Sequence, residues 1–199
     1  MALASTFFYL ARSPTAYKKV ATEVRSTFSS VDSIRAGPAL NSCTYLRAAI
    51  NEAMRLTPPA SQPFWRHVET TGARVGSESF PAGVNVGTSL YVLHHTKSFS
   101  EPYKYDPDRW IPKDDSEEEK LRIKELTRSF APFSIGTRQC LAKNFAMMEM
   151  LLSMANVFWR SDFESAGKLG EDEKGNFNYQ AFFTSHTNGP LIRFRKRSS

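Results

Sequence analysis

The most informative stretch of this sequence reads Phe133-Ser134-Ile135-Gly136-Thr137-Arg138-Gln139-Cys140-Leu141-Ala142. It places a cysteine after a loop that contains glycine, and we expect a long helix to begin near that cysteine. The free N–H groups and the dipole at a helix N-terminus favour a thiolate over a thiol. Gly136 carries no side chain, so the backbone there can approach a flat ligand closely. Residue types alone therefore make Cys140 a candidate thiolate ligand for a metal, with a small buried hydrophobic side chain as the plainer alternative.

Two further residues complete this candidate site. Arg138 lies two residues before the cysteine and can pair with an anionic group such as a carboxylate. Phe133 can cover the sulfur and keep water away, which would tune a metal–thiolate bond. The long helix is predicted from apolar residues at spacings of four and three, which we expect to form a buried stripe. These residues are Leu141, Phe145, Met148, Leu152, Ala155 and Trp159.

A second group of charged residues begins at Glu52-Ala53-Met54-Arg55. This spacing puts the carboxylate and the guanidinium on one face of a helix. Most such pairs are solvated and contribute about 0–1 kcal/mol. Arg109, in the segment Tyr105-Asp106-Pro107-Asp108-Arg109-Trp110, offers a third charge. If Glu52 were buried between both arginines, the loss of one member would cost about 3–5 kcal/mol.

The composition is that of a globular chain. Its 199 residues are 41% hydrophobic and 13% aromatic, which excludes disordered and collagen-like chains. The net charge is +6, and the only dense basic cluster lies in the tail, at residues 193–197. Nucleic-acid binding is therefore a weak interpretation, and a face for an acidic partner protein is equally compatible. Cys43 and Cys140 are too few for a disulfide framework or a four-cysteine zinc site, although one bridge between them stays open.

The length and the hydropathy pattern predict a single domain without a membrane-spanning helix. No segment reaches the roughly 18 uninterrupted apolar residues of a membrane-spanning helix. Residues 1–12 are apolar but short, lack the positive region of a secretory signal, and predict part of a buried helix that begins abruptly. Because neither repeats nor linkers mark a boundary, we expect residues 1–199 to form one domain or a large piece of a bigger one.

Helical periodicity dominates the first third of the chain. Apolar residues predict one helix through Leu3 and Leu10, and a second that starts at Ser13-Pro14. A third helix should be capped by Asn41 or Ser42 and stopped by Pro58-Pro59.

Beyond the third helix, apolar residues recur at every second position, which is the pattern of a β-strand. Short strands are predicted at 64–68 and 84–86, with a turn at 80–83 and a brief helix within 88–95. A charged amphipathic stretch covers 116–126. In the tail, alternating segments at 179–184 and 191–194 flank Asn188-Gly189-Pro190 and predict a hairpin.

Several other polar residues have only plain interpretations. The histidines lack the spacing of metal ligands and are expected to be ordinary surface or turn residues: His67, His94, His95 and His186. Cys43 is expected to be a small side chain in a polar cap region. The acidic run Glu117-Glu118-Glu119 is expected to be a solvated helix face.

Taken in order, three of these segments resemble the C-terminal part of a cytochrome P-450, a haem-thiolate monooxygenase. They are Glu52-x-x-Arg55, Pro107-Asp108-Arg109-Trp110 and Phe133-x-x-Gly136-x-Arg138-x-Cys140. The last motif is highly specific, and the resemblance covers essentially the whole chain. Segments 6–12 and 93–95 are similar to filamentous-fungal microsomal members. The resemblance implies a mainly α fold with small β-sheets: the end of the distal helix, the ExxR helix, the meander, the cysteine loop, a long helix and a C-terminal hairpin.

The resemblance also implies roles for individual residues. Cys140 would be the proximal ligand of the haem iron, and its thiolate would favour O–O cleavage. Arg138 would bind a haem propionate, with Arg66 as its second partner. Phe133 and Gly136 would shape the loop against the porphyrin.

The family's charge triad would consist of Glu52, Arg55 and Arg109. Its expected role is folding and haem retention, so no residue of this chain is assigned a catalytic role. Residues 61–64 are expected to line the substrate cavity.

Two departures from the family pattern matter. Ala142 stands where the family usually has glycine, and we expect haem binding to survive this small replacement. The family's distal helix, with its acid–alcohol pair, should lie just before residues 4–6. The resemblance therefore implies that the membrane anchor, most of the substrate cavity and most of the distal helix lie upstream, and that this chain is well under half of a complete member.

Three functions follow from the resemblance. The first is a monooxygenase that inserts one atom of O2 into a lipophilic small molecule, with electrons from NADPH through a flavoprotein reductase. The second is a truncated, catalytically dead haem-binding fragment. The third is a haem-thiolate isomerase, dehydratase or peroxygenase. A full-length parent would be anchored to the endoplasmic reticulum membrane, whereas this chain, without an anchor, would be soluble or of unknown location.

Overall fold

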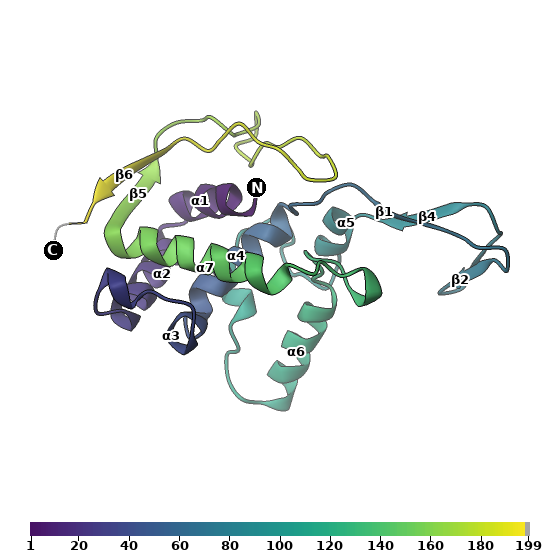
Figure 1. The fold of residues 1–199 in the computed structure, drawn as a ribbon, viewed down its shortest axis with the longest axis horizontal. Helices are drawn as coiled ribbons and strands as arrows, with labels where there is room; N and C mark the ends of the chain where they lie inside the picture. Colours follow the sequence, from purple (N-terminus) through teal and green to yellow (C-terminus); the bar gives the residue numbers. More distant parts are fainter. Residues whose placement is uncertain (198–199) are drawn as a thin grey trace.

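A computed structural model describes residues 1–197, so the last two residues of the expected 1–199 domain lie outside the described part. The fold is mainly helical (Figure 1). The helices are α1 Ala2–Arg12, α2 Pro14–Thr27, α3 Pro38–Asn41, α4 Thr44–Leu56, α5 Leu90–His94, α6 Glu117–Arg128 and α7 Lys143–Arg160. The strands are β1 Phe64–His67, β2 Ala73–Val75, β3 Glu78–Phe80, β4 Asn85–Thr88, β5 Ser161–Ser165 and β6 Ile192–Lys196. Short 3-10 turns lie at Val31–Ser33, Pro107–Trp110 and Gly136–Arg138.

The core lies where α1, α2, α4 and α7 pack together, on the left of Figure 1. Helix α4 is at its centre, because its side chains are buried on almost every face. Val20 and Val24 of α2 and Met154 and Phe158 of α7 are buried in the same cluster. Burial of apolar surface on this scale, at about 25 cal/mol per Å², is the main stabilising term. The helices predicted from periodicity in the first third of the chain are thus confirmed.

The start of α4 differs from its prediction. The residue at the cap position is the buried Cys43, rather than Asn41 or Ser42, and its side chain makes no capping hydrogen bond. The carboxylate of Glu23 on α2 accepts hydrogen bonds from the backbone N–H groups of Tyr45 and Leu46, each at 2.8 Å. The free N–H groups of the first turn need acceptors. A neighbouring helix supplies them here, so no local sequence signal marked the true start.

Three separate two-stranded antiparallel sheets complete the fold. β1 pairs with β4, and β2 with β3, and together they form the arm that extends to the right in Figure 1. The β2–β3 hairpin was not predicted, because its strands are only three residues long and mostly exposed. The brief helix within 88–95 is confirmed as α5.

The predicted hairpin in the tail is wrong. β6 pairs with β5, which directly follows α7, with Phe194 opposite Phe163. Residues 179–184 form no strand, and only an isolated bridge joins Gln180 to His186. Strand pairing over this distance depends on packing against α1 and α7 rather than on the local turn sequence.

Candidate functional site

The cysteine loop, residues 131–142, is held in shape by its own backbone. The N–H of Cys140 donates to the carbonyl of Phe133 at 2.9 Å, and the N–H of Ser134 donates to Ala131 at 2.9 Å. Ser134 and Gly136 both adopt left-handed backbone angles, with φ of 60° and 70°. At Gly136 this conformation explains why glycine is suited to the position. The loop closes on itself and ends at Cys140, just before α7.

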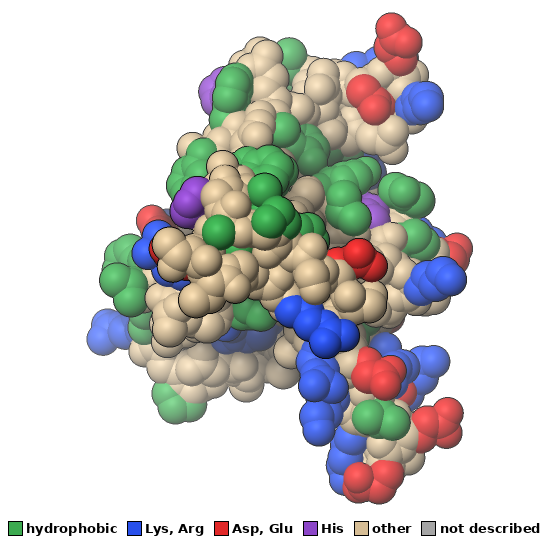
Figure 2. Space-filling view, turned by 90° about the vertical axis from the view of Figure 1, so that its right-hand side faces the viewer, with side chains coloured by type: hydrophobic (Ala, Val, Ile, Leu, Met, Phe, Trp, Pro, Cys, Tyr) green, Lys and Arg blue, Asp and Glu red, His purple; other side chains and the backbone are tan. Residues whose placement is uncertain are grey.

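The thiol of Cys140 lies in an exposed apolar surface. Cys140 is a free, exposed cysteine. Ile135, Leu141 and Phe145 are 73%, 104% and 63% exposed. Figure 2, which faces the hairpin arm and this loop, shows hydrophobic side chains gathered across the middle of the face. Several exposed apolar side chains on one face are typical of a binding surface.

The predicted buried stripe on α7 is therefore wrong in its first half. The side chains of α7 that are buried are Met150, Leu151, Met154, Ala155 and Phe158. The first turns of α7 extend beyond the four-helix core, so Leu141 and Phe145 are exposed and do not belong to the core cluster. The helix is apolar on two faces, and only one of them packs on the core.

The other cysteine has the opposite environment. Cys43 is fully buried, and burial raises the pKa of its thiol. Both cysteines are free, so the disulfide bond between Cys43 and Cys140 that the number of cysteines allowed is not formed. Cys43 is a small core side chain, and Cys140 is the accessible thiol.

Arg138 lies within this loop, and Arg66 lies on β1. Arg138 is exposed in the 3-10 turn and forms no ion pair within residues 1–197. Arg66 is exposed on β1, and its Nη1 donates to the carbonyl of Trp65 at 2.8 Å. Arg66 also lines a cleft of about 400 Å³ together with Ser134 and Ile135 of the loop. The structure thus places Arg138 in the loop itself and Arg66 at the cleft beside it.

The remaining predicted loop residues have mainly backbone functions. Phe133 is half-buried and packs against the hydrophobic core, while its carbonyl holds Cys140. Ala142 is the residue that precedes the first turn of α7, with its carbonyl accepting the N–H of Ala146 at 2.8 Å. A methyl group at this exposed position meets no obstacle that the structure records.

Glu52 is the centre of a buried charge cluster. Its two oxygens accept hydrogen bonds from Arg55 Nη2 and Nε, each at 2.9 Å, and from Arg109 Nε at 2.8 Å. The backbone N–H of Asp106 and the indole N–H of Trp110 also donate to Glu52, at 3.1 and 2.9 Å. Glu52 and Arg55 are 0% exposed and Arg109 is 7% exposed. The cluster fastens the segment 94–110 to α4.

Two polar residues predicted to be exposed are buried. Glu119 is 7% exposed, because it accepts hydrogen bonds from Arg122 and from the backbone of Lys113. His94 is 0% exposed, and its Nε2 accepts the N–H of Ala131 at 3.0 Å. Sequence reasoning missed His94, although Leu90 and His94, one turn apart on α5, form its buried side. Burial, then the charges of Arg55 and His95, lowers the pKa of His94 to about 3.

Of residues 61–64, only Phe64 lines the cleft beside the loop. Ser61 is buried and shares a hydrogen bond of 2.7 Å with Ser185 of the tail. Gln62 donates to the carbonyl of Ala181 at 2.9 Å. This segment therefore joins the tail to the end of α4, and only its last residue faces the cleft.

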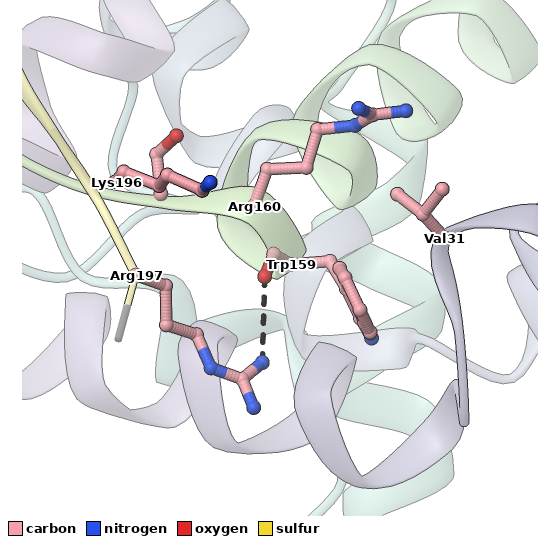
Figure 3. A pocket seen from close by; sticks show the side chains of 6 residues that line it. Val31, Trp159, Arg160, Lys196 and Arg197 are labelled. Atoms are coloured by element: carbon pink, nitrogen blue, oxygen red, sulfur yellow. Dashed lines mark hydrogen bonds between the residues drawn. The ribbon is translucent and has the colours of Figure 1, made fainter. Parts of the chain in front are cut away.

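A second hollow lies at the other end of α7 (Figure 3). It measures about 490 Å³, and Arg197 there donates to the carbonyl of Trp159 at 3.3 Å and lies over its indole ring. Cations beside the last carbonyls of a helix suit its dipole. Arg193 and Arg195 of the same basic tail pair with Glu164. Arg193, Arg195 and Arg197 thus have structural partners, and the tail lies at the other end of α7 from the cysteine loop.

The donor set beside the loop fits an iron porphyrin. In residues 1–197 no group of three or more His, Cys, Asp or Glu side chains is placed to hold a metal ion. A single thiolate with open positions around it suits haem iron. Guanidinium groups suit the propionates, and the exposed apolar side chains suit the flat ring. The chemistry of Cys140, Arg138, Arg66 and the apolar patch therefore matches the group that the sequence resemblance implies.

Comparisons with known proteins identify the family to which the chain is similar. A sequence model of the family described as Cytochrome P450 matches residues 1–185. The cytochrome P450 monooxygenase poxM of Penicillium oxalicum is 40% identical over 98% of this chain and 36% of its own length. The cytochrome P450 monooxygenase apf8 of Gibberella fujikuroi is 42% identical over 98% of this chain and 55% of its own.

The fold has a solved counterpart. The crystal structure of a cytochrome P450, CYP102L1, superimposes with a TM-score of 0.77 at 21% identity, over 99% of this chain and 42% of that one. The chain thus spans about a third to a half of the proteins it matches. Within residues 1–197, no helix has both the length and the apolar composition that crossing a bilayer requires.

Proposed function

The chain belongs to the cytochrome P450 family, and we propose that it forms the iron-holding part of a haem-thiolate monooxygenase. Residues 1–199 are, in this proposal, part of one P450 domain. The observation that carries it is the exposed Cys140 thiol, which lies among exposed apolar side chains on a loop closed by the Phe133–Cys140 backbone hydrogen bond.

Each residue around the loop has a separate task in this proposal. The Cys140 thiolate binds the haem iron, and the apolar side chains of Ile135, Leu141 and Phe145 exclude water from the ring. Arg138 and Arg66 pair with the two propionates. The bound haem supplies the redox chemistry that places one oxygen atom of O2 in a lipophilic substrate and reduces the other to water.

The Glu52 cluster acts on folding rather than on the reaction. Its carboxylate is fully buried and every oxygen is engaged by donors, so it has no access to a substrate. By holding segment 94–110 on α4, the cluster supports the elements on which the cysteine loop rests. This role would retain haem without any catalytic step.

Electrons come from NADPH through a flavoprotein reductase in this proposal. Lys124 and Arg128 on α6 and Lys143 at the start of α7 are exposed cations. None of the three forms an ion pair within residues 1–197. Figure 2 shows blue side chains running down to the projection formed by α6. This face would attract an acidic partner protein beside the loop.

In this proposal the complete protein lies at the endoplasmic reticulum membrane.

The thiolate proposal is tested by a spectrum. The chain is produced with haem supplied, reduced chemically and exposed to carbon monoxide. We expect a Soret band characteristic of thiolate ligation, which Cys140→Ser abolishes. Cys43→Ser is the matched control, because it alters the other cysteine in the core and should keep the band. A thiolate-type band that persists in Cys140→Ser would refute the assignment.

The same preparation tests the electron source. With NADPH and a fungal flavoprotein reductase in place of the chemical reductant, the band should form at a rate that falls several-fold in Lys143→Glu. Chemical reduction of that variant should be unchanged. A variant that is reduced at the wild-type rate by both routes would contradict docking at this face.

A further inference from the structure

The ring of His94 joins α5 to the beginning of the cysteine loop. Its Nε2 accepts the backbone N–H of Ala131 at 3.0 Å. Both residues are buried, at 0% and 6% exposed. A buried N–H needs an acceptor, and for Ala131 this acceptor is the His94 ring.

This hydrogen bond fixes the tautomer of His94. A nitrogen that accepts a hydrogen bond carries no proton, so the ring proton resides on Nδ1. Nδ1 makes no hydrogen bond of good geometry within residues 1–197. Helix α5, which carries His94, packs against α4. His94 therefore lies between α4 and the loop.

The backbone of His94 is tied to the Glu52 cluster. Arg55 Nη1 donates to the carbonyl of His94 at 2.9 Å, while the other nitrogens of Arg55 hold Glu52. The ring also packs against Phe130, which in turn packs against Trp110, with ring centroids 5.1 and 4.6 Å apart. One residue thus contacts the charge cluster through its main chain and the loop through its side chain.

Ala131 is the first residue of the cysteine loop, and its carbonyl makes the first of the loop's backbone hydrogen bonds. Its carbonyl accepts the N–H of Ser134, which adopts a left-handed conformation, and Phe133 then accepts the N–H of Cys140. A displacement of Ala131 would therefore displace Cys140 as well, because two successive backbone hydrogen bonds connect the two residues.

We propose that His94 is a positioning residue for Cys140: its neutral ring fastens the start of the cysteine loop to the α4 charge cluster. The inference rests on the proposed function of Cys140 as a thiolate ligand. Its mechanical part, the His94–Ala131 link, can be tested independently of haem.

The first test is hydrogen exchange in the 199-residue chain. His94→Leu removes the acceptor, and we expect the Ala131 amide to exchange about tenfold faster, as expected for a lost hydrogen bond. His94→Gln can place a carbonyl oxygen near the original Nε2 and should restore most of the protection. His95→Gln is the matched control, because the His95 ring packs on Tyr91 and Tyr103 and its Nδ1 hydrogen-bonds the carbonyl of Tyr91 rather than Ala131. Unchanged protection in a folded His94→Leu chain would overturn the proposal.

A second measurement needs no variant. In the nitrogen-15-labelled wild-type chain, a coupling across the hydrogen bond should connect the Ala131 amide nitrogen to His94 Nε2, and the ring proton should be found on Nδ1. A proton on Nε2 would overturn the proposal even if His94→Leu fails to fold.

The link to the thiolate is tested with haem bound. In His94→Leu, the fraction of the carbon monoxide complex that has lost thiolate ligation should be several-fold larger than in the wild type. In His94→Gln this fraction should rise much less. If the fraction in His94→Leu equals that in the wild type, the positioning role is overturned. If the Ala131 link is observed but the wild type shows no thiolate band, the proposed function fails and the link itself stands.

Discussion

At the scale of single residues, Glu52 is the most heavily bonded side chain beside the site. Its partners come from its own helix, from the 3-10 turn at 107–110 and from the backbone before it. Spacing alone predicted the Arg55 contact, Arg109 was a candidate third charge, and the family resemblance assigned Arg109 to the cluster. Nothing in the local pattern pointed to the indole N–H of Trp110 or to the amide of Asp106, because those contacts depend on how the segment 94–110 folds back onto α4.

Glu52→Gln tests the energy of this cluster. The amide keeps the shape but removes the charge and turns one acceptor into a donor that faces other donors. We expect the free energy of unfolding to fall by about 3–5 kcal/mol, measured by denaturant titration. Glu117→Gln is the control, since its pair with Lys120 is exposed and should contribute about 0–1 kcal/mol. Equal effects of the two substitutions would contradict a structural role for Glu52.

At the scale of secondary-structure elements, periodicity located helices better than it located their buried faces. The sequence of α7 has apolar residues on more than one side, and the stripe through Leu141 and Phe145 was as regular as the one that is buried. Only the position of α7 against α2 and α4 decides between them. The strand partner of β6 was missed for a related reason, because β5 lies far away in the sequence and no local signal joins the two.

The contact between α2 and the start of α4 gives a prediction at this scale. Glu23→Ala leaves the N–H groups of Tyr45 and Leu46 without their acceptor. The loss of such a helix cap costs about 1 kcal/mol. Thr22→Ala, on an exposed neighbouring position of α2, is the control and should change the free energy of unfolding by far less. Denaturant titration of both variants decides whether α4 is capped from its neighbour.

At the scale of the whole molecule, the core and the site lie at different ends of the same helices. The four-helix core could be predicted from the sequence, because its apolar faces pack within this chain. The surface around Cys140 could be identified from residue types and from the family resemblance. Its shape could not, because the apolar side chains of Ile135, Leu141 and Phe145 are largely exposed and are not packed in the core. His94 connects these two regions, which gives the molecule a dependence on pH.

We expect acid to destabilise the folded chain through His94. Its pKa is lowered from 6.5 to about 3 by burial and by the charges of Arg55 and His95. Between these values the unfolded chain binds a proton that the folded chain excludes, so stability is complete above about pH 6.5 and falls as the pH decreases toward 3. One such proton corresponds to about 1.4 kcal/mol per pH unit.

The measurement is denaturant titration from pH 7 to pH 5, above the range in which Glu119 and Asp162 take up protons, because Arg122 and Arg25 hold the pKa values of these carboxylates low. The free energy of unfolding should decline over this range in the wild type. His94→Gln removes the titrating ring but keeps an acceptor for Ala131, so its decline should be distinctly shallower. His95 also has a lowered pKa and contributes a smaller decline of the same sign, which should remain in His94→Gln. Parallel declines in the two proteins would show that the buried ring is not the group that acid protonates.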